Sequence, residues 1–347
     1  MAARARLFRN PLRRDGVGFA AHEITDVLAF ARERPATPLV DAGTLASSLG
    51  LSRLLIKDES ARWGLNAFKI TGASYALDRW RGDDGVERLD GSRRLICASA
   101  GNHGRAVARA ARERGLPCQV FLPADALPSR VEAIRSEGAD VVQIDGTYED
   151  ALTRAGEAAR EPHTLLVSDT SDQVDAREDA GRHQAPRIPD LIVRGYSRVF
   201  AEAADAWDAP PDVIVAQGGV GGLVAAAAGW MRTMLPGAML VAAEPEGAAC
   251  LMESARAGRL TALPSTRATS MVTLRCAEPS ASAWPFVAAG VDAFVAVTDD
   301  EAAGAVRALG SIGIDSGASG ACGLAALTAV AQDVRGRSAM IVVTEGS

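Results

Sequence analysis

The sequence is poor in the residues that build cross-linked, metal-bound or membrane-spanning proteins. It has 347 residues but only five cysteines, and no two of them have CxxC spacing. In a chain of this length, this predicts reduced and mostly buried thiols, and it predicts no metal site. No apolar run reaches the ~18 residues that a membrane span needs, because glycines and Gln217 interrupt the longest candidate, residues 213–229. We therefore expect no membrane partner.

The chain also lacks an excess of positive charge. Its 37 Lys and Arg residues are outnumbered by 43 Asp and Glu residues, which gives a net charge of −6. An acidic chain has no general attraction for phosphate backbones, so we expect no nucleic-acid partner. The arginine-rich start contains Asp15 and runs directly into fold-like sequence, so we interpret it as a solvated start rather than a transit peptide. The expected location is the cytoplasm.

Short β-rich runs alternate with alanine-rich amphipathic runs through most of the chain. Strands are predicted at residues 93–100, 117–123, 140–146, 164–169, 211–217, 238–245, 293–299 and 339–346. Helices are predicted at residues 104–115, 129–139, 148–161, 197–207, 221–234, 301–313 and 320–333. This alternation is typical of α/β proteins with parallel sheets and helices on both faces. The length favours two domains, and the charged, aperiodic residues 171–195 are predicted to be a loop or linker between them.

The first segment that carries chemistry is a glycine-rich loop, Gln-Gly-Gly-Val-Gly-Gly, at residues 217–222. It lies between a predicted strand and a predicted helix, where open α/β sheets bind their ligands. A loop with few side chains can wrap a phosphate, and the helix N-terminus adds amide donors. A close-packed turn between strand and helix would also use glycines, so the loop alone leaves both interpretations open.

The second segment, Ser-Ala-Gly-Asn-His-Gly at residues 99–104, also joins a strand to a helix. Its successive amides would form an anion cradle, and Asn102 would bond a ligand hydroxyl. Ser99 and Asn102 are equally residues that cap helices. The third segment places Lys69 between Phe68 and Ile70 at an apolar helix start, where a buried charge is costly. Lys69 therefore either extends to water or is a Schiff-base lysine with a lowered pKa.

The order of these segments, followed by a C-terminal strand that ends in Thr344, resembles the fold type II pyridoxal-phosphate enzymes. This is the superfamily of tryptophan synthase β and the serine/threonine dehydratases. The resemblance covers roughly residues 35–347. Within the superfamily, it is strongest to the diaminopropionate ammonia-lyases. The narrower likeness rests on Phe68-Lys69 with Gly72-Ala73, residues 101–105, Glu244-Pro245 with Cys250, residues 269–271 with Cys276, and residues 278–280, 283–285, 290–294, 316–320 and 344–346.

The resemblance implies two three-layer α/β/α domains with the active site in the cleft between them. The large domain would hold residues 1–91 and 186–347 and bind the cofactor, and the small domain would hold residues 92–185. Pyridoxal 5′-phosphate is the implied cofactor. Its implied contacts are a covalent bond from Lys69 beside Phe68, a hydrogen bond from Asn102 to the phenolic oxygen, amides of Gly219, Val220, Gly221 and Gly222 on the phosphate, and the Thr344 hydroxyl at a largely unprotonated pyridine nitrogen.

The same resemblance implies the substrate contacts. Ser99, Ala100, Gly101 and His103 belong to the turn that would cradle the substrate carboxylate. Asp169 would lie near the substrate amine and act in catalysis with Lys69. Cys250 and Cys276 stand where the family has a cysteine pair, and either two thiols or a disulfide fits this position.

Three positions depart from the ammonia-lyase pattern. Ala100 replaces an Asp that is thought to act on the D-isomer of the substrate. Asp169 is followed by Thr170 rather than by a nearby aromatic residue, and Ala318 stands where Glu is common. These departures predict an altered pocket and preference for the L-isomer, and they leave open another β-substituted amino acid as substrate.

The implied reaction is α,β-elimination from a β-substituted L-2-amino acid, with 2,3-diaminopropionate giving pyruvate and ammonia. This would make the chain a carbon–nitrogen lyase, with Lys69 taking the α-proton and a nearby acid protonating the leaving amine. A dehydratase of β-hydroxy amino acids and a β-replacement synthase on the same scaffold are the alternatives. Lys69, Asn102 and Thr344 argue against a non-catalytic cofactor-binding protein. Similarity to homodimeric relatives predicts a homodimer.

Overall fold

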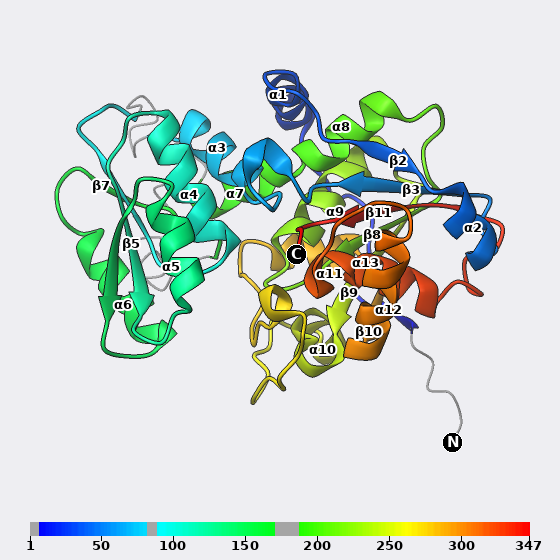
Figure 1. Ribbon diagram of the computed structural model, residues 1–347. Helices are drawn as coiled ribbons and strands as arrows, with labels where there is room; N and C mark the ends of the chain where they lie inside the picture. The colour runs from blue at the N-terminus through cyan, green and yellow to red at the C-terminus, as the bar shows by residue number, and fades with distance from the viewer. Residues whose placement is uncertain (1–6, 82–88, 171–186) are drawn as a thin grey trace. The chain divides into compact units, whose positions relative to one another are not determined.

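The computed structural model describes residues 7–81, 89–170 and 187–347 of the chain (Figure 1). The chain divides into two compact units, of which the first comprises Met1–Phe68 and Tyr196–Ser347 and the second comprises Lys69–Gly195. The predicted small domain, residues 92–185, lies within the second unit, which also contains α3 (Ile70–Arg79). In the described ranges, no helix combines the length and the apolar character that a membrane crossing requires.

The first unit contains a seven-stranded sheet in the order β1-β10-β9-β8-β11-β3-β2. Its inner strands are parallel, and the edge strands β1 and β2 pair antiparallel with β10 and β3. Every residue of β8 is buried, as expected for a strand that helices cover on both faces. The strands are β1 (Leu7–Arg9), β2 (Leu39–Asp41), β3 (Arg53–Asp58), β8 (Val213–Gln217), β9 (Met239–Pro245), β10 (Ala293–Val297) and β11 (Ser338–Val343).

The helices of the first unit are amphipathic or, in α9 and α13, almost wholly buried. They are α1 (Ala21–Ala31), α2 (Gly43–Leu49), α8 (Arg198–Ala206), α9 (Gly222–Met234), α10 (Cys250–Ala257), α11 (Trp284–Gly290), α12 (Asp299–Gly310) and α13 (Ala318–Ala329), with short 3-10 turns at Arg62–Gly64, Glu246–Ala248 and Val272–Leu274. A capping box between Thr298 and Glu301 fixes the start of α12, because the Thr298 hydroxyl accepts from the Glu301 amide.

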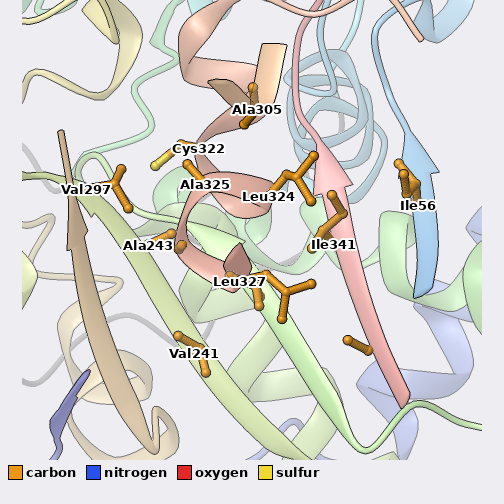
Figure 2. Packing of buried hydrophobic residues seen from close by; sticks show 14 of the residues in the cluster. Ile56, Val241, Ala243, Val297, Ala305, Cys322, Leu324, Ala325, Leu327 and Ile341 are labelled. Carbon is orange, nitrogen blue, oxygen red and sulfur yellow. The ribbon is translucent and has the colours of Figure 1, made fainter. Parts of the chain in front are cut away.

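The main hydrophobic core lies between α13 and the seven-stranded sheet (Figure 2). Leu324 and Leu327 of α13 are 2% or less exposed and belong to one cluster with Ile341 of β11 and Ile56 of β3. Small residues such as Ala325 let the helix lie close to the strands. The sheet is therefore a rigid platform, and the residues that follow its strands are held in fixed positions.

The second unit contains a four-stranded parallel sheet in the order β6-β5-β4-β7. Its strands alternate with helices, which confirms the repeated strand–helix pattern predicted from residue 93 onwards. Ile96, Phe121, Ala151 and Ala155 form its compact core. The elements are β4 (Arg94–Cys97), α4 (Asn102–Glu113), β5 (Cys118–Pro123), α5 (Pro128–Arg135), β6 (Asp140–Ile144), α6 (Tyr148–Ala158) and β7 (Thr164–Leu166).

The prediction of a loop or linker at residues 171–195 is wrong at its C-terminal end. Residues 171–186 lie outside the described residues, but α7 (Ile188–Tyr196) is a helix. Pro189 is its second residue, a position where the missing amide hydrogen of proline costs nothing. Leu191 and Ile192 are buried, and this burial stabilises a helix in sequence that looks irregular.

Candidate active site

The glycine-rich loop and Thr344 follow neighbouring parallel strands of the first unit. β8 ends at Gln217 and β11 ends at Val343, and because the two strands pair in parallel, both segments lie at the same edge of the sheet. The side-chain amide of Gln217 donates to the Val342 carbonyl at 2.7 Å and to the Gly320 carbonyl at 2.8 Å. Gln217 thus ties the loop to β11 and to α13, a role that the sequence motif did not reveal.

The loop presents amide donors at the start of a long helix. Gly221 is the N-cap residue of α9 and has a φ of +99°, a conformation that favours glycine. In the described part of the chain, the amides of Gly219, Val220, Gly221 and Gly222 donate to no protein acceptor. Free amides beside the positive end of a helix dipole are the donor set that a phosphate group requires. The loop therefore fits the phosphate of pyridoxal 5′-phosphate.

The residues before Lys69 run beside the end of β11. The Phe68 amide donates to the Thr344 carbonyl at 3.2 Å, and Ala67 forms a bridge with Glu345. The Phe68 ring also packs edge-on against Tyr196, with ring centroids 4.8 Å apart. Thr344 is 5% exposed, and its hydroxyl forms no hydrogen bond within the described residues. That hydroxyl is available as a donor to a ring nitrogen.

The turn at residues 99–104 connects β4 to α4 in the second unit. The Gly101 amide donates to the Ser99 hydroxyl at 3.3 Å, and α4 begins at Asn102. A Cβ atom on Gly104 would lie 2.0 Å from the Ser99 carbonyl oxygen, so only glycine fits there. Ser99, Ala100, Gly101 and Asn102 are all partly exposed, which leaves the turn accessible to a ligand.

Lys69, Asp169 and His103 of the second unit form a cluster of three titratable groups. The Lys69 Nζ atom lies 2.6 Å from Oδ2 of Asp169. The same oxygen lies 3.8 Å from Nδ1 of His103. On its other side, the His103 ring bonds the Val167 carbonyl through Nε2 at 3.1 Å. The structure therefore brings together Lys69 and Asp169, the two residues predicted to be catalytic, and it places His103 next to Asp169.

The three groups of this cluster differ in exposure and in charge. The side chains of Lys69 and Asp169 are 23% and 18% exposed, whereas that of His103 is 5% exposed. Burial alone would raise the pKa of Asp169, but the adjacent His103 and Lys69 lower it by a larger amount. The pKa of Asp169 therefore lies well below its usual value. Burial lowers the pKa of His103, and the charge of Asp169 offsets only part of this effect. At neutral pH, Asp169 is ionised and His103 is neutral.

The sequence offers few alternatives to Lys69 as a lysine that bonds a cofactor. Lys57 and Lys69 are its two lysines. Lys57 is 1% exposed, and its Nζ atom bonds Glu202 and the Thr37 carbonyl, each at 2.7 Å. Lys69 is therefore the lysine whose amine a small molecule can reach. Because the sequence has only two lysines, its composition alone already limits the choice of a lysine that bonds a cofactor.

Two thiols, Cys250 and Cys276, and one buried acid, Glu244, lie close to the glycine-rich loop. Cys250 and Cys276 are free thiols, so the reduced pair is the alternative that the structure shows, and Cys276 is partly exposed. The Cys250 thiol donates to the Gly219 carbonyl at 3.4 Å. Glu244 is fully buried and accepts from the amides of Leu251 and Met252 at 2.8 and 2.9 Å. Burial raises the pKa of Glu244 to about 8.

Comparison with known proteins accounts for this arrangement. Residues 32–346 match the model of the family described as pyridoxal-phosphate dependent enzymes. The chain belongs to this family. The match covers almost all of the chain and agrees with the extent of the resemblance predicted from the sequence, roughly residues 35–347.

Comparison with individual pyridoxal-phosphate dependent enzymes shows which members of the family this chain is similar to. The diaminopropionate ammonia-lyase of Salmonella typhimurium is 32% identical over 345 residues, covering 89% of this chain and 82% of that protein. The L-threo-3-hydroxyaspartate ammonia-lyase of a Pseudomonas species is 27% identical, covering 90% and 89%. The crystal structure of Escherichia coli diaminopropionate ammonia-lyase with an aminoacrylate–cofactor reaction intermediate has a TM-score of 0.83 at 26% identity, covering 98% and 93%. These similarities confirm the predicted fold type II architecture and pyridoxal 5′-phosphate as the cofactor.

Proposed function

We propose that this enzyme catalyses α,β-elimination from a β-substituted L-2-amino acid, and that L-2,3-diaminopropionate is its substrate. The products would be pyruvate and two molecules of ammonia, with one water consumed in hydrolysis of the released enamine. The observation that carries this proposal is the ionised carboxylate of Asp169, 2.6 Å from the Lys69 amine. The likeness to diaminopropionate ammonia-lyases supports the same assignment.

The residues that would hold the cofactor offer hydrogen-bond donors, an aromatic ring or a reactive amine. Lys69 would bond its aldehyde, Asn102 its phenolic oxygen, and the amides of residues 219–222 its phosphate. Phe68 would lie beside it, and the Thr344 hydroxyl would meet its ring nitrogen. When bound, pyridoxal 5′-phosphate withdraws electrons from the substrate Cα and so weakens its bond to hydrogen.

The protein residues would then move the proton and stabilise the leaving group. The Lys69 amine would take the proton from Cα, the electrons of that bond would form the Cα–Cβ double bond, and the Cβ–N bond would break. A β-ammonium group already carries its proton, so it leaves as ammonia without a general acid. The turn that contains Ser99, Ala100, Gly101 and His103 would hold the substrate carboxylate through its backbone amides.

The charge of Asp169 favours an amine over a hydroxyl as leaving group. A carboxylate near the β-substituent attracts a cationic ammonium group, and a charged hydrogen bond of this kind contributes about 1.5–3 kcal/mol. A hydroxyl leaving group needs a proton donor instead, and a carboxylate with a lowered pKa is a poor donor. Asp169 therefore supports an ammonia-lyase over a dehydratase.

Elimination from a β-hydroxy amino acid is the second candidate function. The relative that acts on L-threo-3-hydroxyaspartate, by its name, supports this candidate, as does Ala100 in place of the usual Asp. A β-replacement synthase on the same scaffold is a further alternative that the sequence alone left open.

Substrate competition tests the proposal. Purified enzyme is given L-2,3-diaminopropionate, L-serine, L-threonine or L-threo-3-hydroxyaspartate, and release of ammonia and 2-oxo acid is measured. We expect kcat/KM for L-2,3-diaminopropionate to exceed the others by about tenfold or more. The Lys69→Ala variant, the matched control, should release nothing from any of them. A higher kcat/KM for a β-hydroxy amino acid would replace the ammonia-lyase with a dehydratase.

A homodimer and a cytoplasmic location are proposed on the family resemblance alone. Light scattering at micromolar concentration tests the first, and a uniform monomer would contradict it. Fractionation of the producing cells tests the second.

A further inference from the structure

Glu244 is a buried acid at the edge of the sheet where the glycine-rich loop begins. β8 and β9 pair in parallel with Gln217 opposite Ala243, and the Gly218 amide donates to the Ala243 carbonyl at 2.8 Å. A Cβ atom on Gly218 would lie 3.2 Å from Cγ of Glu244. The Glu244 side chain therefore packs directly against the first glycine of the loop.

The carboxyl group of Glu244 also fixes a leucine that supports the loop. The Leu251 and Met252 amides, in the first turn of α10, donate to its two oxygens at 2.8 and 2.9 Å. Cβ atoms on Gly218 and Gly221 would lie 2.5 and 3.0 Å from the two methyl groups of Leu251. Leu251 thus fills the space beside both glycines. Through Leu251, Glu244 holds the loop whose amides would bind the cofactor phosphate.

The surroundings of Glu244 offer little compensation for a negative charge. Burial raises its pKa to about 8, although the two amides that donate to it lower the pKa. Among the described residues, Glu253 and Arg256 of α10 also act on it, but their effects oppose each other and the two side chains pair at the surface. Burial raises the pKa of the Cys250 and Cys322 thiols, so these neighbours are uncharged at neutral pH. Glu244 is therefore mostly protonated there.

We infer that Glu244 is a proton-linked positioning residue of the glycine-rich loop, and that the cofactor phosphate binds the form of the enzyme in which Glu244 is neutral. A phosphate ester carries a charge of about −1.5 to −2 at pH 7. The loop contains no lysine or arginine that could balance it. An ionised carboxyl group packed against Gly218 would repel the phosphate in a buried region, where charges are weakly screened.

Phosphate binding should therefore weaken as the pH rises through the pKa of Glu244. Well below about pH 8, the cofactor-free enzyme already holds the proton, and the phosphate meets no opposing charge. Above about pH 8, binding must take up a proton, so the affinity falls by up to about tenfold per pH unit. The titration of Lys69 acts in the opposite direction, because its reactive neutral amine is favoured by high pH.

Comparison of pyridoxal 5′-phosphate with pyridoxal isolates the contribution of the phosphate. Both carry the aldehyde with which Lys69 would react, so the ratio of their dissociation constants removes the titration of that lysine. Each constant is measured by absorbance on cofactor-free enzyme at several pH values. The variant is Glu244→Gln, which keeps the size of the side chain and cannot ionise. The control is Glu246→Gln, which changes an exposed acid that pairs with Arg267.

The phosphate advantage is the dissociation constant of pyridoxal divided by that of pyridoxal 5′-phosphate. We expect it to fall about fivefold or more from pH 7 to pH 9 in the wild type and in Glu246→Gln, and to stay constant in Glu244→Gln. A constant advantage in the wild type, or the same decrease in Glu244→Gln, would overturn the inference. No advantage at pH 7 would show instead that the loop does not bind the phosphate, and the role of Glu244 would fail with it.

Infrared difference spectroscopy of the wild-type enzyme covers the case in which Glu244→Gln does not fold. At about pH 9, above the pKa of Glu244, the carboxyl group should be ionised in the cofactor-free protein. Loading with pyridoxal 5′-phosphate should restore the band of a protonated carboxyl group, and loading with pyridoxal should not. Other carboxyl groups ordinarily ionise far below this pH. The same spectrum with both compounds would contradict the link between the phosphate and Glu244.

Discussion

Oδ2 of Asp169 lies 2.6 Å from Nζ of Lys69, although 100 positions separate the two residues in the sequence. The contact joins Asp169, three residues beyond the end of β7, to Lys69, the residue that precedes α3. It places an ionised carboxylate at the partly exposed amine of Lys69, and the proposed preference for a cationic leaving group depends on this charge.

Asp169→Asn keeps the size of the side chain and removes its charge. We expect kcat/KM for L-2,3-diaminopropionate to fall about 10–100-fold, since a charged hydrogen bond contributes about 1.5–3 kcal/mol. Any turnover of L-serine should change much less, because a hydroxyl group does not depend on that charge. Asp145→Asn, on an exposed turn, is the control. Equal losses with both substrates would mean that Asp169 does not select the leaving group.

Ala100 bears on the stereochemistry of the reaction. A base is needed on each face of Cα to accept both isomers, and Lys69 serves one face only. A positioned base contributes about 10²–10⁴-fold in rate, so we expect at least about a hundredfold preference for the L-isomer in kcat/KM. Ala100→Asp should gain turnover of the D-isomer. Ammonia release from each enantiomer checks this, and equal rates in the natural enzyme would refute it.

Glu244 makes stability depend on pH. Its pKa of about 8 in the folded state exceeds the usual value of 4.5, so the folded chain holds a proton that the unfolded chain has lost. Its contribution is therefore complete below about pH 4.5 and decreases by roughly 1.4 kcal/mol per pH unit towards pH 8. Urea unfolding at several pH values should show this slope in the wild type and lose it in Glu244→Gln. The same slope in both proteins would exclude Glu244 as its source.

Glu202 is central to a buried network of charges. Its carboxylate bonds Lys57 and Arg62, each at 2.7 Å, and Arg198 at 2.6 Å. Glu202→Gln leaves buried cations without this partner, and we expect it to lower the free energy of unfolding by about 3–5 kcal/mol. Glu253→Gln, which breaks an exposed pair with Arg256, should cost less than about 1 kcal/mol. Similar losses in both variants would show that burial does not matter here.

From residue 93 onwards, most of the helices and strands can be predicted from the periodicity of the sequence. The alternation of apolar and amphipathic runs identifies β4 to β11 and most of the helices between them, with ends that differ by a few residues, but it does not identify α7, α10 or α11. β1 and β2 are three residues each and too short to show a period of two. α7 is hidden because Pro189 looks like a breaker, while the burial that stabilises the helix is a property of the folded chain.

The candidate site is predictable as a set of residues but not as a geometry. Lys69, Asp169 and His103 each appear in motifs, yet nothing local shows that one carboxylate oxygen faces the other two. The link from Gln217 to β11 is likewise a contact between distant segments. Such contacts depend on strand order, which periodicity does not specify.

Reduction with borohydride followed by peptide mass spectrometry tests the central claim most directly. The sequence has two lysines, and Lys57 is buried in the network around Glu202, so the enzyme loaded with pyridoxal 5′-phosphate should carry the reduced cofactor on Lys69. The Lys69→Ala variant should carry none. Cofactor recovered on Lys57, or no labelled peptide from the loaded wild-type enzyme, would contradict the account.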